Sequence, residues 1–228
     1  MAHHQALLDR VGDARAEPHE LRILAALEDA GLEEQLGANP STPPDVLERL
    51  AGSRNKAVRF AVGRNSSSPS RVLDALGDPE REASELVRGA VASNPSTPAT
   101  RLLFLTTDSS LAVRCFTAAN SSTPEAGLEV LVHSPSTHVR QAIASNPALP
   151  REIAKMLLEG GDQAILLALA KNPAVDQWLL RLVCDQAEDP AILQAAVWNP
   201  SAGDELQVLR LFETDSLDFL ESSGTVNR

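Results

Sequence analysis

Four arginines recur at a fixed place in a repeated sequence pattern, and they are the side chains in this chain best suited to binding chemistry. Arg59, Arg88, Arg114 and Arg140 each stand six residues before an asparagine that closes one copy of the pattern. If the copies stack, the four guanidinium groups form a stripe, here called the arginine ladder. Guanidinium groups recognise carboxylates and phosphates through paired hydrogen bonds. The ladder therefore predicts a surface for an acidic peptide or for phosphate groups.

A purely structural ladder is the alternative. Each arginine would then pair with a helix C-terminus or with a nearby carboxylate. In the last two copies the equivalent positions are Leu166 and Leu193, so the pattern loses its charge toward the C-terminus. Together with Trp178 and Trp198, these leucines predict either an apolar patch for a partner or packing inside the last repeats.

Two acidic segments are further candidates for contact with a partner. The second copy carries three extra residues within 77–85, GDPEREASE, and predicts an exposed acidic loop there. Residues 211–220, LFETDSLDFL, alternate acids with large apolar side chains. We interpret this second segment as a capping helix or, alternatively, as a docking segment.

Residue groupings typical of enzymes are scarce. His133 and His138 flank a predicted turn without a fixed partner in the pattern, and Cys115 and Cys184 lie far apart in the sequence. The sequence contains no glycine-rich phosphate loop, no HExxH and no GxSxG. We therefore predict that the protein is not an enzyme and has no cofactor and no metal site.

A repeat of about 26 residues must position these side chains. The aligned asparagines are separated by 26, 29, 26, 26, 26 and 27 residues: Asn39, Asn65, Asn94, Asn120, Asn146, Asn172 and Asn199. A nearly constant period of this size is typical of a solenoid. Small and branched apolar residues recur at spacings of three and four within each copy, which indicates two short amphipathic helices. In the first copy we expect them over 43–51 and 56–64.

The pentapeptide NPSTP begins two copies, at 39–43 and 94–98, and altered forms begin others. Asparagine tolerates the left-handed backbone that ends many helices. Threonine is a good N-cap, and the proline after it fits the first helical position, where no N–H donor is needed. We interpret the pentapeptide as the joint between helices rather than as a ligand motif.

The repeat NPxTPxxxLxxLAxxxxxxVRxAVAxN resembles the leucine-rich repeat variant family of bacteria, and more distantly HEAT and armadillo arrays. The resemblance covers residues 38 to about 201. It implies an α-solenoid, a superhelix in which α-helices alternate with short α or 3₁₀ helices. A well-known arrangement in that family places a cysteine cluster with an iron–sulfur centre before the repeats. Residues 1–37 contain no cysteine, so that feature is not implied here.

Three parts follow from this pattern. Residues 1–37 are expected to form an N-terminal helical cap, 38–202 the repeat array, and 203–228 an acidic C-terminal cap and tail. Within the first part, PHELRILAALEDAG at 18–31 predicts a single helix, because proline stands at its start and glycine at its end.

Composition limits the classes of function. The net charge is −11, with 43% hydrophobic but only 3% aromatic residues. Both ends are acidic and the centre is nearly neutral, so the basic footprint of a nucleic-acid-binding domain is missing. The sequence has neither a secretory signal pattern nor an apolar stretch long enough to cross a bilayer, and we expect a cytoplasmic protein.

These observations predict an all-α solenoid that acts as a non-enzymatic scaffold and binds a partner protein or an acidic peptide on its repeat surface. The alternative is a nucleic acid or a phosphate ligand bound along the arginine ladder. The acidic charge and the few aromatic side chains available for stacking on bases disfavour that alternative.

Overall fold

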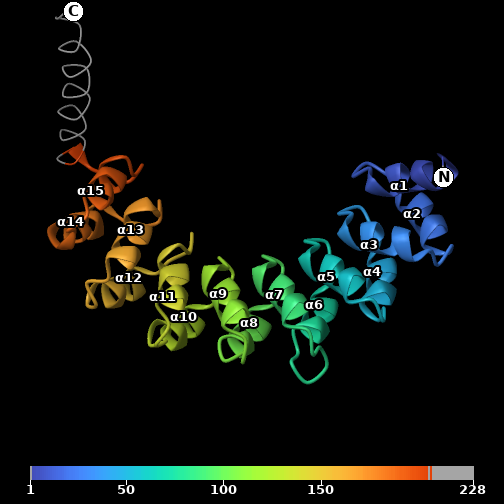
Figure 1. The fold of residues 1–228 in the computed structure, drawn as a ribbon, viewed down its shortest axis with the longest axis horizontal. Helices are drawn as coiled ribbons and strands as arrows, with labels where there is room; N and C mark the ends of the chain where they lie inside the picture. The colour runs from blue at the N-terminus through green and yellow to red at the C-terminus, as the bar shows by residue number, and fades with distance from the viewer. Residues whose placement is uncertain (1, 205, 207–228) are drawn as a thin grey trace, which may run out of the picture. The chain divides into compact units, whose positions relative to one another are not determined.

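The chain folds as a series of short α-helices (Figure 1). The structure is a computed structural model, and it describes residues 2–204 and 206. Within these residues there are fifteen α-helices and neither a strand nor a 3₁₀ segment. They are α1 (Ala2–Gly12), α2 (Pro18–Ala25), α3 (Ala30–Ala38), α4 (Pro44–Ala51), α5 (Lys56–Arg64), α6 (Ser70–Leu76), α7 (Glu85–Ser93), α8 (Ala99–Leu105), α9 (Leu111–Ala119), α10 (Glu125–Val132), α11 (Thr137–Ala144), α12 (Arg151–Leu158), α13 (Gln163–Lys171), α14 (Gln177–Gln186) and α15 (Pro190–Val197).

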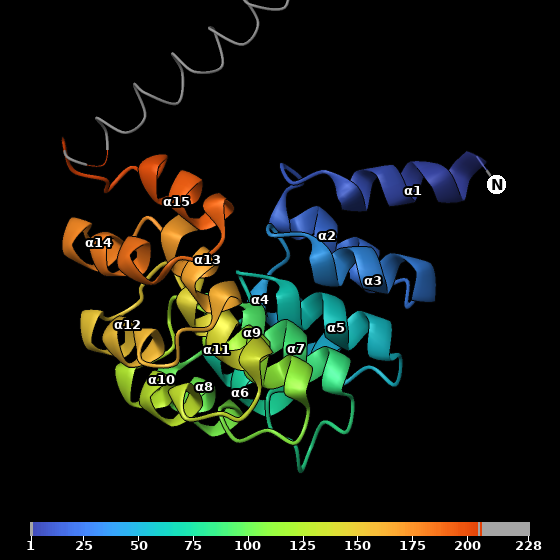
Figure 2. The ribbon, with the colours of Figure 1, turned by 60° about the vertical axis from the view of Figure 1, so that its left-hand side comes forward.

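The most extensive packing is that of odd-numbered helices on the helix two places along the chain, which makes the fold an α-solenoid of helical hairpins. The chain divides into two compact units, Met1–Leu131 and Val132–Arg228, and the division falls within α10. In the first unit α1, α3, α5, α7 and α9 form one layer, and the even-numbered helices form the other. In the second unit α11, α13 and α15 pack in the same manner. Figure 2 shows α1, α3, α5 and α7 following one another in this order.

The predicted elements of the first copy are confirmed. The helix expected over 56–64 has those bounds, and the helix expected over 43–51 begins one residue later, at Pro44. The hydrophobic core also follows the repeat register. The β-branched residue seven places before each asparagine is almost fully buried in every copy: Val58, Val87, Val113, Val139, Ile165 and Ile192.

The repeated asparagines hold consecutive repeats together through their buried side chains. In each case the Nδ2 group donates to two backbone carbonyl oxygens of the preceding repeat, at 2.7–2.9 Å. One acceptor is the carbonyl of the preceding asparagine, and the other lies two residues before it. This set of contacts, here called the asparagine ladder, includes Asn65, Asn94, Asn120, Asn172 and Asn199. It satisfies carbonyl groups at a helix end that would otherwise be buried without a donor.

The other letters of the pentapeptide have separate roles. The Asn94 Oδ1 atom accepts a hydrogen bond from the Ser96 N–H, and the Ser96 hydroxyl donates to Ser66 O of the preceding repeat. The Thr97 hydroxyl donates to Val91 O at 2.6 Å and so satisfies a carbonyl in the last turn of α7. The pentapeptide is therefore a joint between helices, as predicted, and it is also a contact between repeats.

Two details of the predicted joint are wrong. The asparagines adopt extended backbone rather than left-handed backbone; Asn94 has φ −80° and ψ 122°. The threonine does not cap the next helix, because Pro98 occupies the N-cap position of α8 and the Thr97 hydroxyl points back to the preceding helix. Both differences have one cause: the side chains are used to bind carbonyl groups of earlier segments.

The N-terminal segment differs from the single helix predicted over 18–31. Here α2 ends at Ala25, Glu28 has a positive φ of 52°, and Asp29 begins α3 by accepting hydrogen bonds from the N–H groups of Gly31 and Leu32. The Asn39 Nδ2 group donates to carbonyls at the end of α1, as later asparagines do to their own preceding repeat. Residues 2–38 thus continue the packing of the repeats.

The acidic C-terminal segment predicted for 203–228 falls almost entirely beyond the part of the chain that the structure describes. The possible capping or docking segment at 211–220 lies outside the described residues.

Replacing Asn94 by alanine should lower the free energy of unfolding by roughly 2–4 kcal/mol, because two buried carbonyl groups lose their donor. Urea unfolding followed by circular dichroism measures this difference. Ser66→Ala, at an exposed position of the neighbouring joint, is the matched control and should change stability little. Equal free energies of unfolding for the two variants would contradict the proposed contribution of the asparagine ladder to stability.

Candidate interaction surface

All four arginines of the ladder make the same local contact. Each guanidinium donates from Nη1 to the backbone carbonyl six residues upstream, in the turn before its own helix. The pairs are Arg59 to Ser53 (2.8 Å), Arg88 to Glu82 (2.9 Å), Arg114 to Asp108 (2.5 Å) and Arg140 to Ser134 (2.5 Å). The recurrence of arginine at this position therefore has a structural cause, the turn that precedes each odd-numbered helix.

Arg59 and Arg88 also bind a carboxylate of the following repeat. Arg59 binds Glu82 through Nε and Nη2, at 2.6 and 3.1 Å. Arg88 binds Asp108 in the same two-pronged geometry, at 2.7 and 2.9 Å. Arg88, Asp108 and Glu82 are buried, and Arg59 is largely so. These two members of the arginine ladder are not free to bind an acidic partner, which corrects the hypothesis of one continuous binding stripe.

The two buried carboxylates remain ionised because of these contacts. Burial by itself would raise the pKa of the Asp108 carboxyl, but hydrogen bonds from the Arg88 guanidinium and the Ser110 N–H outweigh it and lower the pKa. The Glu82 carboxyl has a lowered pKa for the same reasons, with Arg59 and the Ser84 N–H as donors. Each ion pair links two repeats, and its two opposite charges cancel.

Arg114 and Arg140 differ from the first two arginines. Neither forms an ion pair with a carboxylate of the described chain. The repeat register places Ser134 and Gly160 where Glu82 and Asp108 stand in earlier repeats. Serine and glycine provide no carboxylate, so the outer edge of these two guanidinium groups lacks the partner that the earlier ones have.

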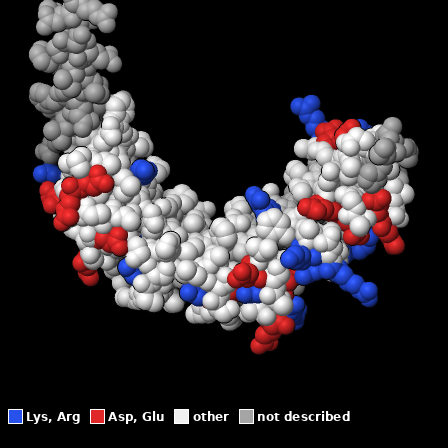
Figure 3. Space-filling view, viewed as in Figure 1, with Lys and Arg blue, Asp and Glu red and all other residues white. Residues whose placement is uncertain are grey.

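Charges on the even-numbered helices of the first unit are also used between repeats. Three ion pairs join successive helices from α2 to α8: Arg22 with Asp45, Arg71 with Glu48, and Arg101 with Asp74. In Figure 3 blue and red side chains lie together along the lower edge of this unit.

The predicted apolar patch near the C-terminus is only partly on the surface. Leu166 is completely buried, so it cannot contribute to a surface patch. Trp178 is 46% exposed, but Arg151 and Lys155 of α12 lie over its ring, at 4.9 and 5.6 Å from the centroid. Leu193 on α15 and Trp198, the residue that follows this helix, are exposed. Leucine at position 166, where the earlier repeats have arginine, is therefore part of the hydrophobic core of the second unit.

The acidic insertion at 77–85 is likewise only partly a surface loop. Glu82 is buried in its contact with Arg59, while Glu80 and Glu85 are exposed. The loop lines one side of a hollow of about 480 Å³ next to Phe104, whose side chain is 70% exposed. Arg101 lies over the Phe104 ring, 5.4 Å from its centroid.

An exposed apolar surface on α7 and α9 was missed by the sequence reasoning. Leu86, Leu111 and Phe116 are 59%, 41% and 49% exposed, and their helices pack side by side. Leu86 and Phe116 stand eight and four places before their asparagines, a spacing of about one turn that puts these two register positions on one helical face. Leu111 stands nine places before its asparagine, at the N-terminal end of α9 and farther around the helix. We call these three residues the α7–α9 face. In Figure 3 the upper edge of the first unit, over α7 and α9, is mostly free of charged side chains.

Phe116 stands at a register position that holds alanine in the other copies. The ring lies against Gly89 of α7, where an added Cβ atom would be 3.2 Å from Phe116 Cδ2. A phenylalanine where every other copy has alanine was the signal in the sequence that marks this position as different.

The remaining candidates do not converge on a reactive centre. His133 and His138 are exposed, and the part of the chain that the structure describes contains no group of three or more potential metal-ligating side chains. Burial raises the pKa of the Cys115 and Cys184 thiols, which are free and partly buried.

Comparison with protein-family models, with curated proteins and with solved structures finds no match to this chain. The helical repeat is thus established by the structure itself, and membership of a family is not. No helix among the residues with a described placement is long and apolar enough to cross a membrane.

Replacing Asp108 by asparagine should lower the free energy of unfolding at neutral pH by about 3 kcal/mol, because Arg88 would be left as a buried charge without its partner. Asp74→Asn, which removes an exposed partner of Arg101, should cost less than about 1 kcal/mol. Urea unfolding of both variants and the wild type measures the two costs. Equal costs would contradict the structural role of the buried pair.

The same comparison has an expected pH dependence. The folded-state pKa of Asp108 lies below that of the unfolded chain, so the pair stabilises the fold above the ordinary aspartate pKa of about 3.9 and loses this contribution as the pH falls through the folded value. The stability difference between wild type and Asp108→Asn should therefore be constant near neutral pH and shrink below about pH 4.

Gly160→Asp should add the carboxylate that Arg140 lacks. A Cβ atom built at Gly160 meets nothing within 4 Å, and its φ lies outside the left-handed region, so a side chain can be accommodated. We expect a gain in unfolding free energy of about 0.5–1 kcal/mol. The gain should be absent with Gly160→Asn and in an Arg140→Leu background. A gain that persists without Arg140 would show another cause.

Proposed function

We propose that the protein is a non-enzymatic scaffold that binds a partner protein on its repeat surface. The observation that carries this proposal is the α7–α9 face, where three large apolar side chains are exposed on adjacent helices. Exposed apolar groups that adjoin one another are typical of protein contact sites, whereas single exposed leucines are not informative. The rigid layer of packed odd-numbered helices holds the three side chains in fixed relative positions.

The chemistry of the described side chains supports a binding role over catalysis. Resolved pKa shifts among them occur in arginine–carboxylate pairs or in the two cysteine thiols, whose raised pKa values disfavour a nucleophilic thiolate. An active site usually shows shifted groups that converge in a cleft. Here the shifted groups belong to ion pairs between separate segments of the chain or are partly buried thiols.

Membership of the leucine-rich repeat variant family of bacteria is part of this proposal. The support for it is the repeat itself, in which the asparagine, the serine and the threonine of NPSTP each form a hydrogen bond of their own to an earlier segment. Nucleic-acid binding has less support, because Arg59 and Arg88 are already neutralised by carboxylates of the chain.

The proposal predicts a partner whose binding depends on the α7–α9 face. Wild-type protein, Leu86→Ser/Phe116→Ser and Ile23→Ser should be immobilised and used to capture proteins from a cell extract, followed by mass spectrometry. Ile23 is 63% exposed on α2 and provides the matched control. We expect at least one protein that wild type and Ile23→Ser retain and that the double variant loses at least about tenfold, because its apolar contact is removed.

Circular dichroism and urea unfolding should show that the variants remain folded. A set of captured proteins that is the same for all three forms would contradict the proposed function.

A further inference from the structure

The α7–α9 face is bordered by positive charges that form no ion pair with a carboxylate of the described residues. Lys56 and Arg64 are the first and last residues of α5, which packs beside α7, and both are exposed. Neither forms an ion pair within residues 2–204 and 206. Lys56 stands nine places before Asn65, which is the register position of Leu111 in α9. Arg64 stands one place before Asn65, about two turns from the register position of Leu86 and on the same side of the helix.

Two further features make this border positive. Arg64 lies over the ring of Phe60, 5.8 Å from its centroid, so its side chain is drawn along the exposed face of α5. Arg114 of α9, one turn from Leu111, has a guanidinium edge that pairs with no carboxylate in the described part of the chain. Against these cations the exposed face has one acid on α7, Glu85.

We infer that the partner docks through a segment in which large apolar side chains alternate with or adjoin aspartate and glutamate. This inference rests on the proposed function and specifies the partner's chemistry. Apolar side chains of the segment cover Leu86, Leu111 and Phe116 and remove them from water. Its carboxylates meet Lys56 and Arg64, where complementary charge favours this partner over a basic one.

A second copy of the chain fits this surface less well. Contact of the face with itself would bring Lys56 and Arg64 of both copies to one interface, and like charges across an interface are unfavourable. A single-stranded nucleic acid also fits less well, because it requires several aromatic rings as stacking platforms, and Phe116 is the one ring on the α7–α9 face.

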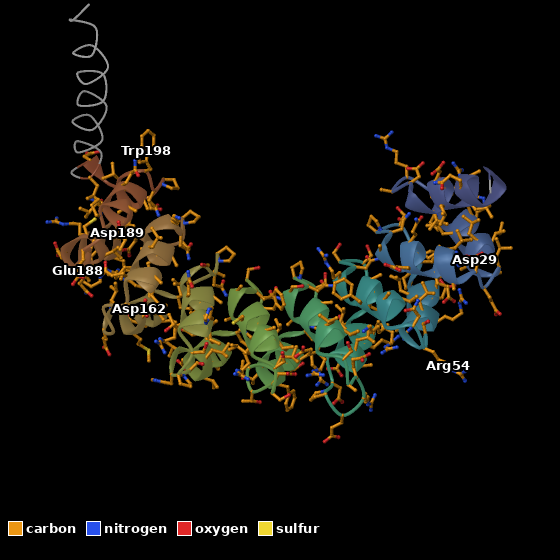
Figure 4. The ribbon with its side chains drawn as sticks, viewed as in Figure 1. Asp29, Arg54, Asp162, Glu188, Asp189 and Trp198 are labelled. Carbon is orange, nitrogen blue, oxygen red and sulfur yellow. The ribbon has the colours of Figure 1, made fainter. Side chains whose placement is uncertain are left out.

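Selection from a library of short random peptides displayed on phage tests the inference directly. Selected peptides are synthesised, and their binding is measured by fluorescence anisotropy at low and high salt. The variants are Leu86→Ser, Leu86→Ser/Phe116→Ser and Lys56→Glu/Arg64→Glu. Arg54→Glu is the matched charge control, because Arg54 is exposed and points away from the protein at the turn before α5 (Figure 4).

Peptides selected by the wild type should combine leucine, isoleucine or phenylalanine with acids. Their affinity should fall at least about tenfold with Leu86→Ser/Phe116→Ser and about tenfold with Lys56→Glu/Arg64→Glu, while Arg54→Glu changes it little. The single variant Leu86→Ser should weaken binding as well, independently of any effect of Phe116 on folding. A selection repeated on Lys56→Glu/Arg64→Glu should yield basic peptides instead of acidic ones.

The outcomes separate this inference from the function on which it rests. Peptides that depend on Leu86 and Phe116 but show no preference for acids would overturn the inference and leave the scaffold proposal standing. If no selected peptide binds wild type more tightly than the Leu86→Ser/Phe116→Ser variant, both are overturned. Self-association that sedimentation shows to be lost in Phe116→Ser, or oligothymidylate binding lost in Lys56→Glu/Arg64→Glu, would replace the inferred partner with a second copy or a nucleic acid.

Discussion

The pair of hydrogen bonds from each ladder asparagine to the preceding repeat is the interaction on which the rest of the structure depends. Helices of seven to eleven residues are too short to be stable alone, so they need their neighbours. A helix end also leaves carbonyl groups that must find donors when they are buried. The asparagine amide solves both problems together, because it binds two such carbonyls and fixes the distance between repeats. Asn94 makes the same two contacts as Asn65 despite the three extra residues before it.

That constraint determines where sequence variation is tolerated. The insertion lies in the turn between α6 and α7, away from the asparagine joint, and its Glu82 still reaches Arg59. Farther along, leucine replaces arginine at position 166 and is fully buried. The turn that begins α13 carries Asp162, and the turn that begins α15 carries Glu188 and Asp189. Figure 4 shows these three acids at one edge of the second unit. The same register position thus serves charge pairing at Arg59 and Arg88 and apolar packing at Leu166.

Local features of the sequence were sufficient to predict the helices of the repeats. They were not sufficient to predict the contacts between repeats. The bounds of α4 and α5 follow from proline positions and apolar spacing, which act within a few residues. The partner of Arg88 is Asp108, twenty residues away, and it is recognisable only when adjacent repeats are placed in register. The break at Glu28 arises because Asp29 caps a new helix, and a periodic apolar pattern conceals such a break. The Phe116 ring lies against Gly89 of the neighbouring repeat, a contact that no single copy reveals.

The contact between Gly89 and Phe116 has a consequence for how such a chain can change in length. Arrays of identical units can grow or shrink by duplication and deletion, since any unit fits any other. Here the phenylalanine of one unit packs closely on a glycine in the unit before it, just as Arg88 pairs with the acid of the unit after it. Each unit is therefore matched to particular neighbours. Recombination that exchanged their order would bring unmatched surfaces together, so these repeats behave as a fixed series rather than as interchangeable modules.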